Sequence, residues 1–144
     1  MRGTGLTART AARRSEIPNE AVQVRLLTIA VGGSLGALCR YFVTGWVQSL
    51  AAGPFPVGTL FVNFTGCFVF GALAAVFAAS APTSDPYRVL MLIGFLGAYT
   101  TFSTFSWDTL ALFDDGRVDL ALLNVGASNL LCLGGVWLGH RLAS

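Results

Sequence analysis

The chain has 144 residues, of which 54% are hydrophobic and only 11% are charged. A water-soluble domain carries roughly a quarter charged residues, so this composition excludes an ordinary soluble globule and indicates a membrane protein. The formal net charge of +2 is too small to suggest a nucleic-acid-binding surface, so no nucleic-acid partner is expected.

Residue types that carry catalysis or bind metals are scarce. Three cysteines, Cys39, Cys67 and Cys132, each fall within an apolar segment, and their number and spacing match neither a disulfide framework nor a zinc site. The single histidine, His140, is in the last few residues of the sequence, so a histidine-based active site is not expected. The sequence also shows no nucleophile–base pair, and we expect that the protein is not an enzyme.

The first 24 residues are polar and contain four arginines. A targeting segment would have a short apolar core and a small-residue cleavage site, but a full-length apolar stretch follows here instead. We predict a flexible basic tail over residues 1–24, in which Pro18-Asn19 prevents helix formation, and a transmembrane unit over residues 25–142. The arginines of the tail favour the cytoplasmic side of the membrane.

Four apolar stretches follow, and each is long enough to cross a bilayer as a helix, which needs about 20 residues. They are predicted at about residues 26–47, 57–79, 89–113 and 120–140. The first and the last contain small-residue patterns that let membrane helices approach closely, Gly32-x-x-x-Gly36 and Gly135-x-x-x-Gly139. The predicted fold is therefore an all-α membrane protein with four transmembrane helices.

The third stretch contains an unusual block from Gly94 to Ser106, in which five hydroxyl side chains and two phenylalanines fall within seven residues. Unpaired hydroxyls are costly in hydrocarbon, so another helix, water or an ion must face them. Two glycines followed by adjacent threonines are poor helix formers, and we predict that the third helix breaks at membrane depth. Such a break frees backbone carbonyls that can hold a cation.

Phe102 and Phe105 are three residues apart and share one helical face. Such a pair usually means packing, but a polar stripe of Thr101, Thr104 and Asp108 runs beside it and favours a lining role. Asp108 lies towards the end of the span, where an interfacial or capping role is expected.

Two isolated polar residues each have two readings. Asn63, in the second stretch, either forms an interhelical hydrogen bond or lines a path as an amide N–H donor. Arg40, in the first stretch, either extends to the membrane interface or places a cation near an anion entrance. The fourth stretch carries a further polar stripe, Asn124, Ser128 and Cys132. Four helices enclose no wide pore and each stripe needs a partner, so a two-fold dimer is expected.

Three longer motifs follow one another along the chain. They are Gly32-Gly33-x-x-Gly36-Ala37-x-x-Arg40-Tyr41, Pro56-x-Gly58-Thr59-Leu60-x-x-Asn63-x-x-Gly66 and Gly94-Phe95-x-Gly97-x-x-Thr100-Thr101-Phe102-Ser103-Thr104-Phe105-Ser106. The Thr-Thr-Phe-Ser-Thr-Phe block in the last motif is specific. Together the motifs resemble the Fluc (CrcB) family of bacterial fluoride channels, and the resemblance covers about residues 26–139.

The resemblance implies an antiparallel, dual-topology dimer of four-helix subunits with two narrow fluoride paths. The residues that it assigns to each path are Asn63, Phe102, Phe105, Ser103, Thr104 and Ser128. It also implies a central structural sodium ion, held by the backbone carbonyls of Gly97 and Thr100 from both subunits. Arg40 would be an entrance or structural residue.

The function that the resemblance implies is passive export of fluoride across the bacterial cell membrane, with the lipid bilayer as surroundings. Three positions depart from the family pattern. Asn124 stands where tyrosine is usual, Cys132 stands in place of a serine, and Asp108 stands in place of a glutamate. These departures affect the polar track at its fourth-helix end and leave the central motif intact.

Seven arginines lie on the side of the tail and only Arg117 lies opposite, apart from Arg40, so the N-terminus is predicted in the cytoplasm. This bias raises the alternative of a heterodimer with an oppositely oriented paralogue in place of a homodimer. Two other functions are open. A proton-coupled multidrug exporter needs a membrane-embedded carboxylate, normally in the first helix, where this chain has none. In a non-transporting scaffold, the polar stripes would only join helices.

Overall fold

The computed structural model of the chain describes residues 19–80, 82 and 85–144, and every regular element among these residues is helical. In chain order the elements are α2 (Asn19–Leu50), α3 (Val57–Ser80), α4 (Pro86–Arg88), η1 (Val89–Leu96), α5 (Gly97–Tyr99), α6 (Phe102–Asp114) and α7 (Val118–Ala143). Within this described part, four stretches are long and apolar enough to cross a membrane: α2, α3, the series from α4 to α6, and α7. The all-α fold with four membrane-spanning helices is therefore confirmed.

The first helix, α2, begins earlier than the stretch predicted at residues 26–47. The prediction that residues 19–24 belong to the flexible tail is wrong, because they form the first turns of this helix, whereas residues 1–18 lie outside the described part. Glu20 is in the first turn, where a carboxylate interacts favourably with the positive end of the helix dipole. A proline directly before a helix does not interrupt it, since only interior positions need the N–H that proline lacks.

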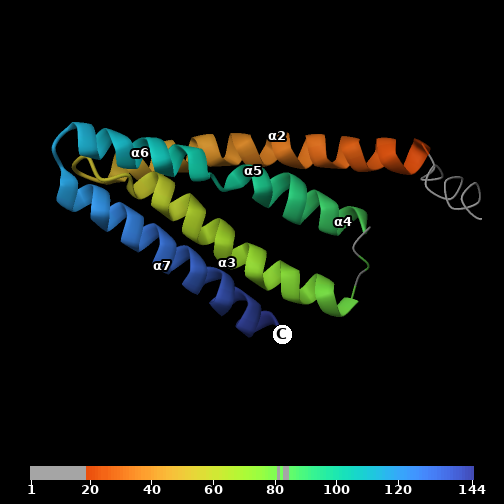
Figure 1. Ribbon diagram of the computed structural model, residues 1–144. Helices are drawn as coiled ribbons and strands as arrows, with labels where there is room; N and C mark the ends of the chain where they lie inside the picture. The colour runs from red at the N-terminus through yellow and green to blue at the C-terminus, as the bar shows by residue number, and fades with distance from the viewer. Residues whose placement is uncertain (1–18, 81, 83–84) are drawn as a thin grey trace, which may run out of the picture.

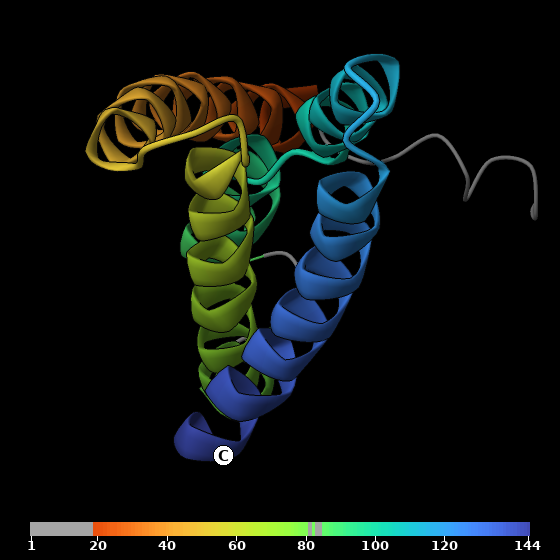
Figure 2. The same cartoon turned by 90° about the vertical axis from the view of Figure 1, so that its left-hand side faces the viewer.

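The second and fourth spans, α3 and α7, lie side by side and form the most extensive contact between two helices (Figures 1 and 2). Their backbones approach closely. A methyl group on Gly71 would overlap the carbonyl of Val136, and one on Gly139 would overlap the carbonyl of Phe68. The close-packing face predicted for Gly135 and Gly139 is therefore confirmed, and it faces α3.

The third span is broken, as predicted. Its first part runs through α4, η1 and α5, and η1 is wound as a π-helix. Thr100 and Thr101 then adopt extended backbone angles, with φ and ψ of −82° and 155° for Thr100 and −150° and 119° for Thr101. A new helix, α6, starts at Phe102 (Figure 1). The break lies at the two adjacent threonines.

The break gives the two parts of the third span different neighbours. Before it, η1 and α5 pack against α2, and after it α6 packs against α7. The contact with α2 is close, because a methyl group on Gly36 would overlap the carbonyl of Phe95 and one on Gly94 would lie 3.1 Å from the Cα of Gly32. The small-residue face predicted for Gly32 and Gly36 is confirmed by this contact.

A small apolar core joins these helices. Val62 of α3 packs with Leu92, Leu96 and Tyr99 of the third span. Many other large apolar side chains face outward, and Leu130 of α7, for example, is 75% exposed. Such a surface would be unfavourable in water, but it suits lipid or a second membrane-embedded chain.

Adding one methyl group at Gly139 is expected to lower the free energy of unfolding by about 2 kcal/mol, because overpacking a tight contact typically costs about 1–3 kcal/mol. Thermal unfolding of Gly139→Ala in detergent measures this loss. Gly134→Ala is the matched control on the same helix, since nothing lies within 4 Å of the added methyl group. The control should be as stable as the parent chain, because alanine favours helix. Equal stability of the two variants would contradict the close α3–α7 contact.

Candidate functional site

Asn63 of α3 is hydrogen-bonded to the backbone at the break of the third span. Its Nδ2 donates to the carbonyl of Thr101 at 2.9 Å, and the N–H of Thr101 donates to its Oδ1 at 2.7 Å. The side chain is only 8% exposed. The amide thus satisfies both backbone groups of a residue that has left the helix, as a neighbouring strand would. Of the two readings of Asn63, the interhelical hydrogen bond is present.

The hydroxyl of Thr101 begins α6. Its Oγ1 accepts from the backbone N–H of Thr104 at 3.2 Å, which is the N-cap arrangement. The same oxygen donates to Oγ1 of Thr104 at 3.0 Å and lies 3.2 Å from Oγ of Ser103. Three hydroxyls of the block are therefore hydrogen-bonded to one another, and those of Thr100 and Ser106 donate to backbone carbonyls. These bonds lower the cost of placing the hydroxyls at membrane depth.

These two interactions leave two carbonyls without their usual helical donors. The N–H of Thr101, which would bond the carbonyl of Gly97 in a continuous helix, donates to Asn63 instead. The N–H of Thr104, which would bond the carbonyl of Thr100, donates to the hydroxyl of Thr101. Gly97 and Thr100 are the two residues predicted as sodium ligands. Neutral carbonyl oxygens are suitable ligands for a hard cation, so the donor set fits the ion.

A cavity of about 240 Å³ lies between the start of α6, α3 and α7. We call it the phenylalanine cavity, and its lining residues are Asn63, Thr100, Thr101, Phe102, Phe105, Ser128, Asn129, Cys132 and Leu133. No acidic or basic side chain is among these lining residues. The cavity combines aromatic rings with amides and hydroxyls. The amides and hydroxyls are uncharged groups that can donate hydrogen bonds to an anion.

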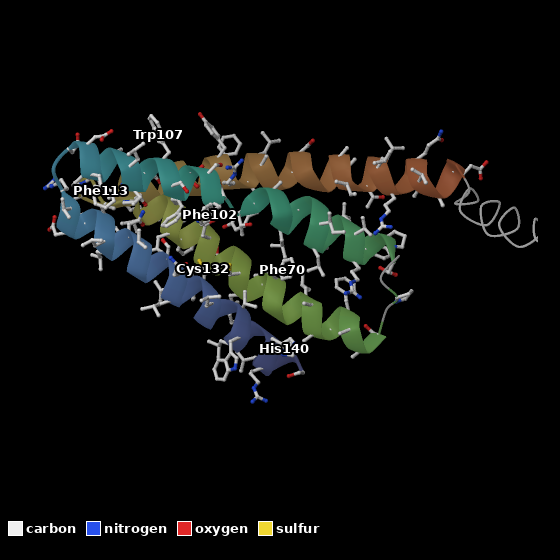
Figure 3. The ribbon with its side chains drawn as sticks, viewed as in Figure 1. Phe70, Phe102, Trp107, Phe113, Cys132 and His140 are labelled. Carbon is white, nitrogen blue, oxygen red and sulfur yellow. The ribbon has the colours of Figure 1, made fainter. Side chains whose placement is uncertain are left out.

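The two phenylalanines differ in exposure. Phe105 is 8% exposed, whereas Phe102 is 77% exposed and lies at the start of α6, beside the break (Figure 3). Their ring centroids are 5.3 Å apart and the rings are tilted by 51°. Because the hydrogen edge of a benzyl ring is its positive side, such a pair can meet an anion edge-on. Phe102 reaches the surface of the described chain, so one side of the cavity is open.

A second cavity, of about 380 Å³, lies where α2 meets the start of α6. We call it the arginine cavity, and its lining residues are Ala37, Arg40, Tyr41, Thr44, Gly45, Thr101 and Thr104. Nε of Arg40 and Oγ1 of Thr44 are buried and have no hydrogen-bond partner among the described residues. Buried polar groups normally have hydrogen-bond partners, so these two are available to bind a water molecule or an ion. The guanidinium makes this cavity electropositive.

Thr101 lines both cavities, so the break stands between them. The structure thus brings four of the six predicted path residues into the phenylalanine cavity, namely Asn63, Phe102, Phe105 and Ser128. Thr104 instead lines the arginine cavity with Arg40, and Ser103 is exposed and lines neither. Two polar lining residues were not among the predicted site residues. Thr44 is one helical turn from Arg40, and Asn129 is three residues before Cys132, so helical spacing was the available signal.

A line of hydrogen bonds extends from the phenylalanine cavity between α6 and α7. Ser128 Oγ donates to Oδ1 of Asn124 at 3.3 Å, and Nδ2 of Asn124 donates to Oγ1 of Thr109 at 2.9 Å. Thr109 in turn donates to the carbonyl of Phe105 at 2.7 Å. Asn124, which replaces the tyrosine usual in the resembled family, is 1% exposed. Both polar atoms of its amide take part in this line of hydrogen bonds.

Asp108 contacts the beginning of another helix. Its carboxylate Oδ2 accepts a hydrogen bond from Oγ1 of Thr59 at 2.7 Å. Thr59 is in the first turn of α3, where the positive end of the helix dipole favours a negative charge. Asp108 thus lies beside the start of α3, and its interfacial or capping role stays a prediction.

Replacing Asn63 by alanine is expected to lower the free energy of unfolding by about 2 kcal/mol or more, because it leaves two buried backbone groups of Thr101 unpaired. Asn129→Ala is the matched control, since this amide lines the same cavity but bonds only a carbonyl of its own helix. Chemical or thermal unfolding in detergent measures both. If the two variants were equally stable, the amide of Asn63 would not hold the break.

Comparison with known proteins identifies the family of the chain. The family model described as "CrcB-like protein, Camphor Resistance (CrcB)" matches residues 27–140. Three similar proteins each bear the name "Fluoride-specific ion channel FluC". The one from Methylococcus capsulatus is 46% identical over 122 residues, which are 85% of this chain and 54% of the relative. This chain therefore spans about half the length of that relative.

Two shorter relatives are matched over nearly their whole length. The protein from Geotalea daltonii is 44% identical over 114 residues, 79% of this chain and 92% of the relative. The protein from Citrifermentans bemidjiense is 43% identical over 119 residues, 83% of this chain and 96% of the relative. The family match over residues 27–140 and these identities show that the chain belongs to the CrcB family, which its motifs resemble.

Proposed function

We propose that this chain is a subunit of a fluoride-specific ion channel that lowers cytoplasmic fluoride by passive export through a bacterial cell membrane. The observation that carries the proposal is the phenylalanine cavity, where two aromatic rings, an amide and a hydroxyl converge without any charged side chain. The name shared by the three relatives supports the same ion.

The lining of this cavity suits a small, strongly hydrated anion. Entry into a narrow, dry path is costly unless donors replace the lost water. Asn63 and Ser128 supply N–H and O–H donors, and the edges of Phe102 and Phe105 supply weaker positive contacts. A path narrow enough to match fluoride would exclude chloride, because the larger ion would neither fit nor recover its hydration energy.

The arginine cavity would act as the entrance. Arg40 and Thr44 present buried donors without partners, and Thr101 connects this cavity with the phenylalanine cavity. A fixed cation at a cavity mouth raises the local concentration of anions, and salt weakens this effect. Of the two readings of Arg40, we therefore propose the one near an anion entrance.

A proton-coupled exporter has less support. Its chemistry needs a carboxylate that a substrate cation and a proton share inside the membrane. Among the described membrane spans, Asp108 is the only acidic residue that does not lie at a helix end. Its carboxylate accepts a hydrogen bond from Thr59. The two cavities also contain more polar side chains than are needed to hold neighbouring helices together. This disfavours a non-transporting scaffold.

We expect Phe102→Ile to reduce fluoride efflux from liposomes by about tenfold or more, which corresponds to about 1.4 kcal/mol of lost stabilisation along the path. Isoleucine keeps the apolar bulk but has no ring edge. A fluoride electrode measures the efflux, and a chloride electrode should record no release by any variant. Fluoride efflux no faster than from empty liposomes would overturn the proposed function.

Trp107→Ile is the matched control on the same helix, because Trp107 lines neither cavity and points away from α3 and α7 (Figure 3). Its efflux should equal that of the parent chain. Arg40→Gln tests the entrance in the same assay, and its loss of efflux should be largest at low ionic strength. A loss independent of salt would contradict the electrostatic role of Arg40.

We further propose that two subunits form an antiparallel dimer. The phenylalanine cavity opens at Phe102, and polar groups that open onto lipid are unfavourable unless another chain covers them. A homodimer is the simplest assembly, and a heterodimer with an oppositely oriented paralogue is the alternative that the uneven arginine distribution favours. Purified chain that forms no dimer by itself would overturn the homodimer.

A structural sodium ion would join the subunits in this proposal. One chain supplies the carbonyls of Gly97 and Thr100, whose helical donors are diverted, and the second copy would supply the same pair. Four neutral oxygens would then surround the ion, which would add a fixed positive charge near the two paths.

Replacing sodium by a large organic cation is therefore expected to lower the thermal stability of the dimer, because binding stabilises the assembled state by mass action. Thermal unfolding at several sodium concentrations measures the effect, and native mass spectrometry records the dimer. A midpoint that is independent of sodium would overturn the ion's structural role. Lithium or potassium at equal ionic strength controls for general salt effects.

A further inference from the structure

Two cysteines lie on the facing sides of two closely packed helices. Cys67 of α3 and Cys132 of α7 are both free thiols and both are partly buried. Each lies four residues before a member of the close contact between Gly71 and Val136. Figure 3 shows Cys132 where α7 lies beside α3. Cys39, the third cysteine, is on α2 and packs instead against the apolar core.

The backbones that carry the two thiols are held in place. One helical turn beyond the pair, Gly71 is so close to Val136 that a methyl group between them would overlap its carbonyl. A pair of side chains on such closely packed helices keeps its separation, because neither helix can move away without losing this contact. The two sulfur atoms are therefore arranged in advance for a ligand that both can bind.

The surroundings of the thiols select the type of ligand. Cys132 lines the phenylalanine cavity, whose lining contains no acidic or basic side chain. Nothing there favours the thiolate that reaction with a peroxide or a disulfide requires. A ligand that displaces the thiol proton itself is favoured instead. Soft metal cations do this, because their bonds to sulfur are strong.

We propose that Cys67 and Cys132 form a binding site for a soft, two-coordinate metal cation, represented here by Hg²⁺. Each thiol loses its proton to water and forms one sulfur–metal bond, so that one Hg²⁺ and two thiols give one neutral sulfur–mercury–sulfur bridge and two protons. No electron is transferred. The product carries no net charge, which suits its position within the membrane span.

The bridge would also obstruct the phenylalanine cavity, because the sulfur of Cys132 is part of its wall. This second part rests on the proposed function, since it concerns fluoride passing through that cavity. The first part, the binding of the metal, does not depend on any ion flux.

The binding test uses the full chain with Cys39→Ala, because Cys39 would react separately with the metal. The protein is treated with an excess of Hg²⁺ and washed, and then bound mercury and free thiols after denaturation are counted. A bridge gives one mercury per chain and no free thiol. Two mercury atoms per chain would show that the thiols react independently, and two free thiols would show that neither reacts. Either result would overturn the proposal.

The matched control carries Cys67→Ala in addition to Cys39→Ala, and thermal unfolding before treatment verifies that both proteins fold. A competing monothiol should remove mercury from the control, which holds the metal through one sulfur, and should leave it on the bridged protein. Equal retention by the two proteins would contradict a bridge between Cys67 and Cys132.

Fluoride efflux from liposomes then tests the obstruction. Hg²⁺ should abolish most of the efflux of the Cys39→Ala protein, and an excess of a dithiol should restore it. Full efflux from protein that holds one mercury per chain would overturn the obstruction. Absence of efflux before any mercury is added would instead overturn the proposed function, and the mercury count would still decide the binding site.

Discussion

The hydrogen-bonded pair between the amide of Asn63 and the backbone of Thr101 determines how the third span is built. A transmembrane segment normally satisfies its backbone groups within its own helix, and two residues that leave the helix lose that satisfaction. Asn63 replaces it with bonds of 2.9 and 2.7 Å from a neighbouring span. The break can therefore persist at membrane depth, and α6 can leave α2 and pack against α7.

The diversion of two N–H groups follows from the same pair. Once Thr101 bonds Asn63, the Thr101 hydroxyl is placed to accept from the N–H of Thr104. The N–H groups of Thr101 and Thr104 then no longer donate to the carbonyls of Gly97 and Thr100. The amide thus acts in two directions. It places Phe102 and Phe105 on a new helix on one side, and on the other it leaves the carbonyls of Gly97 and Thr100 without their usual helical donors.

The sequence allowed the spans and the break to be predicted, because length, apolar composition and the two glycines at positions 94 and 97 before the adjacent Thr100 and Thr101 act locally. The start of α2 was missed, since nothing local marks how far a helix continues beyond the bilayer. Similarly, the proximity of Arg40 to Thr104, and of Cys67 to Cys132, depends on which faces of separate helices meet. Helical spacing restricts these faces but does not choose among them. The path roles of the individual residues remain predictions.

The two readings of Asn63 that the sequence left open do not exclude each other. The Nδ2 atom carries two hydrogens, and one of them donates to the carbonyl of Thr101. Among the described residues no acceptor takes the second, while the side chain lines the phenylalanine cavity. An amide fixed by two bonds to the backbone also loses little freedom when it meets an ion, so its remaining N–H is oriented in advance. The group that stabilises the break is for this reason well suited to donate to an anion beside it.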